Sequence, residues 1–371
     1  MEDESVIVIN EELLRDHAFF ALFDGHGGDQ ASLYAKENIL RLIKESPKWK
    51  EYCLRKGENH ALVTLRGEEE KEDEKDKVLL QEALVQAFGE LEEEMYRNKD
   101  IILAAGCTAT AAFITPKWII CANIGDSRTV LGKIKSSDDT YNVDACDGGD
   151  YGSINIDLSI DHKPNVPEEK ARIERNGGFV SFDEGDCPRV NGALAFSRSL
   201  GDFTFHFLKC QEGKGASEQI ISPVADVTPY KRDNAVDEIL LLACDGLWDV
   251  CTSYEAVSRI KELWTVYREK SLELCAEECL DWALSRKTTD NVSVILVKLP
   301  AAKIPEEEEF DEGSKVGEDA TERIQSIGGG VARIRAIRER EPFDMYDLAV
   351  HLPKNSPAPG SAFDGIDYDN E

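Results

Sequence analysis

The chain has 371 residues, 42% hydrophobic and 31% charged, with a formal net charge of −30 at pH 7. This composition is typical of a globular protein with one large or two modest domains. The negative charge argues against nucleic acid or an anionic membrane as a partner and suits divalent cations. No apolar run reaches the roughly 20 residues needed to span a bilayer. The start, Met1-Glu2-Asp3-Glu4, lacks a secretory signal and the N-myristoyl pattern.

Strand-like and helix-like segments alternate over the first 300 residues. Strands are predicted at 5–9 and 18–23, a helix at 29–44, a charged surface insertion at 67–77 and a helix at 78–97. Short connections predict that the strands at 108–114, 117–124 and 127–134 are antiparallel neighbours. A loop at 136–156, a helix from Pro167 to Gly177, a strand at 239–243, helices near 255–264 and 272–286, and a strand at 292–299 complete the series.

The composition changes after Pro300. An acidic run at 306–309, three glycines at 328–330 and a proline-rich stretch at 355–360 predict that residues 300–371 form an acidic, largely disordered tail. Isoleucine or valine recurs every three or four residues in the segment 324–337, at positions 324, 327, 331, 334 and 337. This segment is therefore a candidate for a transient docking helix, and a solvated tail is the alternative.

Aspartates mark the ends of several apolar strands. Asp24 and Asp245 directly follow such strands, Asp126 lies in a tight Gly-Asp-Ser turn, and Asp290 precedes the last strand. Aspartate-glycine pairs are ordinary turn formers, but charged groups next to buried strands are costly unless paired or bound to metal. Oxygen ligands without clustered cysteines or histidines favour Mg²⁺, Mn²⁺ or Ca²⁺ over zinc.

Such carboxylates suit the hydrolysis of phosphate esters. Two divalent ions roughly 3.5–4 Å apart can activate a water for in-line attack on phosphorus. A serine or threonine alkoxide needs a proton as it leaves, and a nearby imidazole can supply it. His26 follows Asp24 by two residues and is the candidate general acid. The ten cysteines are scattered and are interpreted as buried thiols in a reducing compartment.

At these residues the sequence resembles the metal-dependent protein phosphatases of type 2C. The ordered motifs are FDGHGG at 23–28, GCTA at 106–109, NIGDSR at 123–128, DHKP at 161–164, RVNG at 189–192, LAFSRSLGD at 194–202, DGLWDV at 245–250 and Asp290-Asn291. The likeness covers residues 1–299, which we expect to form the catalytic domain. It implies an α+β fold, a four-layer α-β-β-α sandwich of two antiparallel sheets flanked by helices.

The resemblance also implies roles for single residues. Asp24 would bridge two Mg²⁺ or Mn²⁺ ions, with the carbonyl of Gly25 on one of them and Asp245 and Asp290 on the other. Glu2 and Asp3 would bind metal through water, Asp126 and Asp249 would join Asp245 in a weaker third metal site, and His26 would be the general acid. Residues 165–190 match a flap beside the cleft. Phosphoproteins are the implied substrates, and a monomer is the implied state. The missing targeting signals and the cysteine usage, rather than the resemblance, predict a place in the cytosol or nucleus.

The sequence departs from the family pattern at two places. The family carries a phosphate-clamping arginine four residues before the glutamate matched by Glu2, and this chain begins at Met1. We therefore expect weaker substrate binding or activity, and a first strand cut short, because a point charge does not replace the bidentate guanidinium. Cys107 stands where the family has serine, a nearly isosteric change.

Two other classes compete with an active phosphatase. A pseudophosphatase, which would bind or scaffold with little or no turnover, is favoured only by the missing arginine, because every matched carboxylate is present. A Ca²⁺-binding module would have its ligands in one compact loop, and no such loop occurs in the sequence. The sequence does not identify the physiological substrate.

Overall fold

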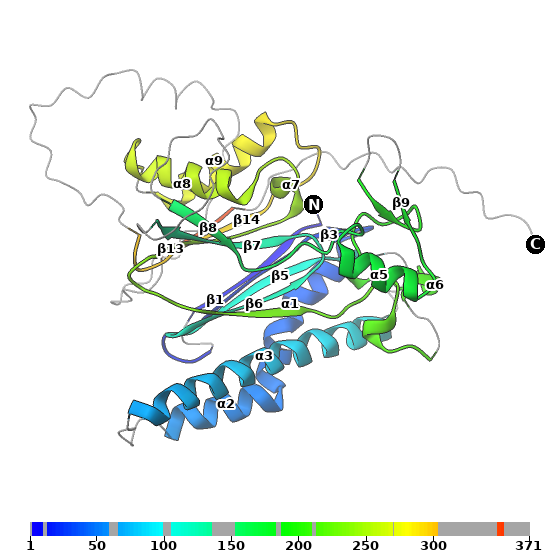
Figure 1. The fold of residues 1–371 in the computed structure, drawn as a ribbon, viewed down its shortest axis with the longest axis horizontal. Helices are drawn as coiled ribbons and strands as arrows, with labels where there is room; N and C mark the ends of the chain where they lie inside the picture. Colours follow the sequence, from blue (N-terminus) through cyan, green and yellow to red (C-terminus); the bar gives the residue numbers. More distant parts are fainter. Residues whose placement is uncertain are drawn as a thin grey trace, which may run out of the picture.

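Two antiparallel sheets, packed face to face, form the centre of the molecule (Figure 1). The computed structural model describes residues 2–9, 13–58, 66–98, 105–135, 153–182, 187–209, 213–269, 271–302 and 347–351. The first sheet has the order β1 (Glu4–Ile9), β2 (Ala18–Phe23), β5 (Ala109–Ile114), β6 (Trp118–Ile124), β12 (Asp226–Lys231). The second has the order β15 (Asp347–His351), β14 (Val294–Lys298), β13 (Asp237–Ala243), β7 (Arg128–Ile134), β8 (Ser153–Asp157).

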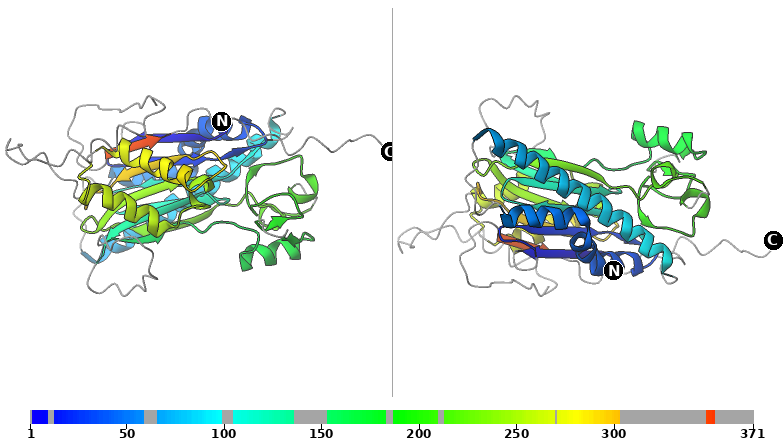
Figure 2. Two further views of the ribbon diagram at one scale, coloured as in Figure 1. Left: turned by 90° about the horizontal axis from the view of Figure 1, so that it is seen from above. Right: turned by 90° about the horizontal axis from the view of Figure 1, so that it is seen from below.

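Helices cover the outer face of each sheet, which confirms the predicted α+β class. The first sheet is covered by α1 (Gln30–Glu45), α2 (Pro47–Glu58) and α3 (Arg66–Arg97), as the right-hand view in Figure 2, seen from below, shows. The second is covered by α8 (Ser253–Thr265) and α9 (Leu272–Ser285). None of the helices in the described residues is apolar over a length that could cross a membrane.

The central strands have buried apolar side chains on both faces of their sheet. β2 reads AFFALF and is buried along its whole length. Phe19 and Phe23 pack with the helices, whereas Phe20 and Leu22 pack between the two sheets. This division follows from the period of two in a strand, because successive side chains point to opposite faces. The continuous apolar run is thus the signature of a strand covered on both sides.

The prediction for the third of the three close-set strands is wrong. β5 and β6 are antiparallel neighbours, but β7 lies in the second sheet between β13 and β8. Gly125, with a φ of 98°, lets the chain turn out of the first sheet. Hydroxyl pairs then join β5 to β7 across the interface, with Thr110 and Thr129 oxygens 2.8 Å apart.

The charged segment 67–77 is not an insertion between elements, because it forms the first part of α3. It lies at the surface, since the side chains at 71–77 other than that of Asp76 are exposed or half-buried. Glutamate and lysine are good helix formers, and charges along this segment find partners on neighbouring elements. Asp76 accepts from Arg55 Nε of α2 at 2.9 Å, and Asp73 accepts from Lys117 Nζ at 2.8 Å. The other predicted helices, at 29–44, 167–177, 255–264 and 272–286, are confirmed within a few residues.

Part of the C-terminal segment belongs to the second sheet. β15 pairs with β14 in antiparallel register, with Asp347 opposite Lys298 and His351 opposite Val294. The proposed docking helix at 324–337 lies outside the described residues, as do most of the predicted tail and of the loop at 136–156. Residues 153–157 of that loop form β8.

A smaller unit lies at one end of the sandwich (Figure 2). It contains α5 (Pro167–Arg175), β9 (Val180–Ser181), β10 (Arg189–Val190), α6 (His206–Lys209) and a 3₁₀ turn (Ala216–Glu218). Its apolar cluster centres on Ile173, Val190 and Ile221 and is separate from the main core. Beside it, a short sheet of β3 (Gly25–His26), β4 (Gly106–Cys107) and β11 (Leu200–Gly201) connects this unit to the sandwich.

Candidate active site

The predicted metal-ligating aspartates lie at the ends of different strands. Asp24 follows β2, and Asp126 lies in the turn between β6 and β7. Asp245 is the first residue of α7 (Asp245–Trp248), directly after β13, and Asp290 lies in the connection from α9 to β14. Figure 1 shows α7, β3 and the N-terminal end of the chain together at this place.

Electrostatics shows that these carboxylates converge. Burial raises the pKa of Asp24 well above its ordinary value, and the negative charges of Asp245, Asp3 and Asp290 raise it further. Burial likewise raises the pKa of Asp245, with Asp126 as the largest charge contribution. Carboxylates crowded in this way need either protons or cations to offset their repulsion.

Within the acidic cluster of Asp3, Asp24, Asp126, Asp245 and Asp290, two buried carboxylate oxygens lack a hydrogen-bond partner in the described structure. Asp3 is 1% exposed; its Oδ2 accepts from Ser293 Oγ at 2.5 Å, and its Oδ1 has no partner. Asp126 is also 1% exposed, and its Oδ1 has no partner. Orphaned buried acceptors are rare in native proteins. Both belong to the acidic cluster, so a cation is the natural missing partner.

The remaining predicted ligands stand around this cluster. The backbone carbonyl of Glu2 accepts a hydrogen bond from Ser32 Oγ, and Gly25 opens β3 opposite Cys107 of β4. Asp249 ends α7 and is exposed. Within the described part of the chain, no three His, Cys, Asp or Glu side chains are arranged to hold a metal as they stand. The hard oxygen donors and the orphaned acceptors nevertheless fit Mg²⁺ or Mn²⁺.

His26 is held by a partner that the sequence analysis did not identify. Its Nε2 lies 2.8 Å and 2.9 Å from the two carboxylate oxygens of Asp202, which is 1% exposed. Asp202 Oδ2 also accepts from Ser199 Oγ at 2.6 Å. A Cβ on Gly106 would lie 2.4 Å from His26 Nε2 and 2.5 Å from Asp202, so only glycine leaves room for this pair.

The pair favours a charged imidazole. Desolvation lowers the pKa of His26, but the charge and hydrogen bond of Asp202 more than offset this effect, so the pKa is raised. Burial tends to raise the pKa of Asp202, but His26 and then Lys209 keep it below its ordinary value. His26 is therefore protonated over a wider pH range than a free histidine, as an acid catalyst requires.

Comparison with known proteins identifies the family of the chain. The family model for protein phosphatase 2C matches residues 1–292. The chain belongs to the protein phosphatase 2C family. It is 31% identical to human protein phosphatase 1B over 88% of the chain and 60% of the relative, and 32% identical to protein phosphatase 2C homolog 2 of Schizosaccharomyces pombe over 76% of the chain and 63% of the relative. The chain thus spans about 60% of the length of these relatives.

The fold of this protein phosphatase 2C chain is similar to that of a solved family member. The crystal structure of serine-threonine phosphatase 2C from Toxoplasma gondii superposes with a TM-score of 0.63 at 24% identity, covering 80% of this chain and 90% of that one. Bovine protein phosphatase 1A is 32% identical over 84% of the chain and 72% of the relative. Proteins of this family are metal-dependent in general.

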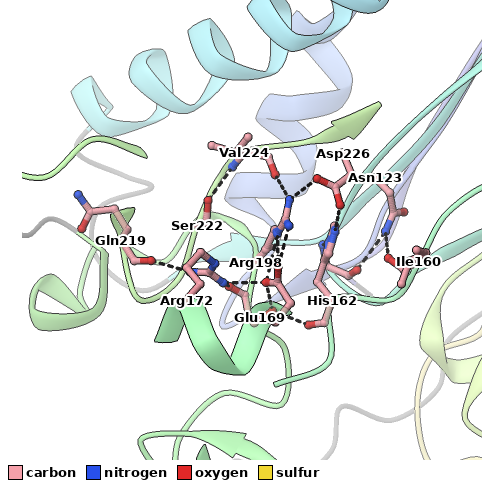
Figure 3. Close-up of polar contacts among 12 residues, drawn as sticks. Asn123, Ile160, His162, Glu169, Arg172, Arg198, Gln219, Ser222, Val224 and Asp226 are labelled. Carbon is pink, nitrogen blue, oxygen red and sulfur yellow. Dashed lines mark hydrogen bonds and ion pairs between the residues drawn. The ribbon is translucent and has the colours of Figure 1, made fainter. Parts of the chain in front are cut away.

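A buried ionic network holds the first helix of the predicted flap in this protein phosphatase 2C chain (Figure 3). Glu169 of α5 is 3% exposed and accepts from Arg172 Nη2 and Arg198 Nη2, each at 2.7 Å. Arg198 also donates to Asp226 Oδ1 of β12 at 2.6 Å. The other oxygen of Asp226 lies 3.1 Å from Nε2 of His162. The network therefore connects the flap helix to the first sheet.

Replacing Glu169 by glutamine is expected to destabilise the fold by about 3 kcal/mol, because two mostly buried guanidinium groups lose their shared counter-charge. Burial opposes ionisation of Glu169, but Arg198 and Arg172 lower its pKa to about 2. A lowered carboxyl pKa stabilises the fold above pH 4.5, and this contribution is lost as pH falls toward 2. The measurement is urea unfolding of both proteins at pH 7 and pH 3.5.

The control for this prediction is Glu174→Gln on the same helix. Glu174 is exposed and lies 3.8 Å from Lys170 Nζ, so its loss should cost less than about 0.5 kcal/mol. Equal stabilities of Glu169→Gln and Glu174→Gln at pH 7 would show that the buried network contributes nothing specific.

Proposed function

We propose that this chain hydrolyses phosphoserine and phosphothreonine esters on proteins with the aid of divalent metal ions. The convergence of Asp3, Asp24, Asp126, Asp245 and Asp290 is the observation that supports it most. Family membership adds support, since the similar proteins of Homo sapiens and Schizosaccharomyces pombe are named protein phosphatases.

The acidic cluster would hold the ions in this proposal. Asp24, Asp245 and Asp290 would bind two of them directly, the carbonyl of Gly25 would complete one shell, and Asp3 would contribute its unpartnered oxygen or hold a water. Mg²⁺ or Mn²⁺ bound there would supply a water of lowered pKa for in-line attack and positive charge to stabilise the phosphoryl oxygens.

His26 would act as the general acid. A serine or threonine oxygen leaves as an unstable alkoxide unless a proton reaches it during bond cleavage. The imidazolium of His26 carries that proton, and Asp202 orients the ring through Nε2. Nδ1, the other ring nitrogen, is then the atom that can face the leaving group. The ring of Phe196 packs against the imidazole with its centroid 4.8 Å away and limits its rotation.

The test is phosphate release from a phosphothreonine peptide by the chain, with Mn²⁺ or Mg²⁺ titrated and EDTA as the metal-free control. We expect release that rises with either ion and stops in EDTA. A folded chain that binds Mn²⁺ but releases no phosphate would overturn the proposal and favour a binding or scaffolding role.

A further inference from the structure

Lys163 lies inside the acidic region, at the base of the flap. Its Nζ donates to Asp126 Oδ2 at 2.6 Å and lies 3.4 Å from Asp249 Oδ1. Asp126 comes from the turn between β6 and β7, and Asp249 from the end of α7. One ammonium group thus bridges two carboxylates that are far apart in the sequence and that we predict to hold a third, weaker metal ion.

The ammonium group of Lys163 occupies the place between Asp126 and Asp249 where the third metal ion is predicted to bind. Asp126 offers one oxygen to Lys163, while its other oxygen is buried without a hydrogen-bond partner in the described structure. A divalent ion and an ammonium group cannot both lie within bonding distance of the same carboxylate pair without strong repulsion. The side chain of Lys163 is 23% exposed, and its flexible four-carbon stem can turn toward solvent.

We propose that Lys163 is a built-in competitor for the third metal ion, which binds Asp126 and Asp249 only when the ammonium group moves away. The inference rests on the proposed function because it assumes that this carboxylate pair takes a divalent ion. It explains physically why such an ion would be held weakly: its binding must break a charge-assisted hydrogen bond to a buried carboxylate. Occupancy of this position would then follow the divalent-ion concentration.

A positioning role for Lys163 predicts the opposite behaviour. If the lysine orients Asp126 for metal binding, removing its charge weakens the third ion. If it competes, removing its charge strengthens the third ion, because the cluster becomes more negative and no hydrogen bond must break. The sign of one change in affinity therefore separates the two roles.

The experiment is Mn²⁺ binding to the full chain, followed by the electron paramagnetic resonance of free Mn²⁺, for the unchanged protein and Lys163→Gln. We expect the weakest Mn²⁺ site to tighten at least about tenfold in Lys163→Gln, with the tighter sites little changed. Lys163→Arg keeps the positive charge, so the weakest Mn²⁺ site should keep its low affinity in this variant. Lys170→Gln is the matched control, since the side chain of Lys170 is 45% exposed and its Nζ lies 3.8 Å from Glu174 on α5.

A second measurement uses the unchanged protein and does not depend on how a variant folds. Acetylation of lysines by acetic anhydride, read by mass spectrometry, should modify Lys163 faster as Mn²⁺ fills the weak site, while Lys170 reacts at a constant rate. An unchanged or weaker third-site affinity in Lys163→Gln, or a Lys163 acetylation rate that stays level or falls, would overturn the inference. Neither readout requires hydrolysis, so failure of the proposed activity would be seen separately.

Discussion

Replacing Asp245 by asparagine is expected to lower metal-dependent phosphate release from a phosphothreonine peptide by about a thousandfold or more. The carboxylate lies at the centre of the acidic cluster, where it interacts with Asp126 and Asp290. Asparagine keeps the shape of the side chain but loses the negative charge, so divalent ions bind weakly. The measurement is kcat/KM with Mn²⁺ titrated over a wide range.

The same variant should have the reverse effect on stability without metal. Burial and neighbouring charges raise the pKa of Asp245, so its ionised form destabilises the metal-free fold at neutral pH. Asp245→Asn is therefore expected to unfold at a higher temperature than the unchanged protein in EDTA and to gain less stability from Mn²⁺. Asp157→Asn, at an exposed residue of β8, is the matched control. Full metal-dependent activity of Asp245→Asn would refute its role as a ligand.

Replacing Asp202 by asparagine is expected to reduce turnover of a phosphothreonine peptide by about a hundredfold. Turnover of p-nitrophenyl phosphate should fall much less, because nitrophenolate leaves without a proton. The loss on the phosphopeptide is expected because both carboxylate oxygens of Asp202 contact His26 Nε2, and these contacts orient the imidazole ring and keep it protonated. Equal losses on both substrates, with Mn²⁺ affinity unchanged, would contradict the acid-catalyst role of His26.

The pH profile provides an independent readout. Asp202 raises the pKa of His26 above 6.5, so the acid form is lost only as pH rises through that raised value. Without the carboxylate, desolvation lowers the pKa, and the alkaline decline in kcat for the phosphothreonine peptide should begin at lower pH. Ser199→Ala removes one hydrogen bond to Asp202 but leaves the negative charge of Asp202 in place. It should therefore shift the profile much less.

The acidic cluster could be predicted from sequence because its signal is local. Asp24 and Asp245 each end a continuous apolar strand, and a charge at that place needs a partner. The partner of His26 carried no such signal. Asp202 is 176 residues away and has a φ of 59°, so only the folded chain brings it to the imidazole. The preceding Ser199-Leu200-Gly201 in the LAFSRSLGD motif was the available hint.

Sheet membership was the main limit on predicting the fold. The apolar run of β7 indicates a buried strand, but nothing in its pattern says which of two packed sheets it joins. The turn at Gly125 takes the chain from the first sheet to the second, and the hydroxyl contact between Thr110 and Thr129 joins β5 to β7 across the interface. A single glycine and two threonines do not indicate such a crossing in the sequence. Similarly, the charges at 67–77 looked like a solvated insertion because their partner Arg55 lies on another helix.

The central claim is that carboxylates from separate strand ends form one divalent-metal centre, and crystals soaked in Mn²⁺ test it most directly. Anomalous scattering recorded near the manganese absorption edge locates the ions without any assay of activity. The account predicts Mn²⁺ peaks within ligand distance of Asp24, Asp245 and Asp290. Soaked crystals with no manganese at these three residues, or with manganese only elsewhere on the acidic surface, would contradict it.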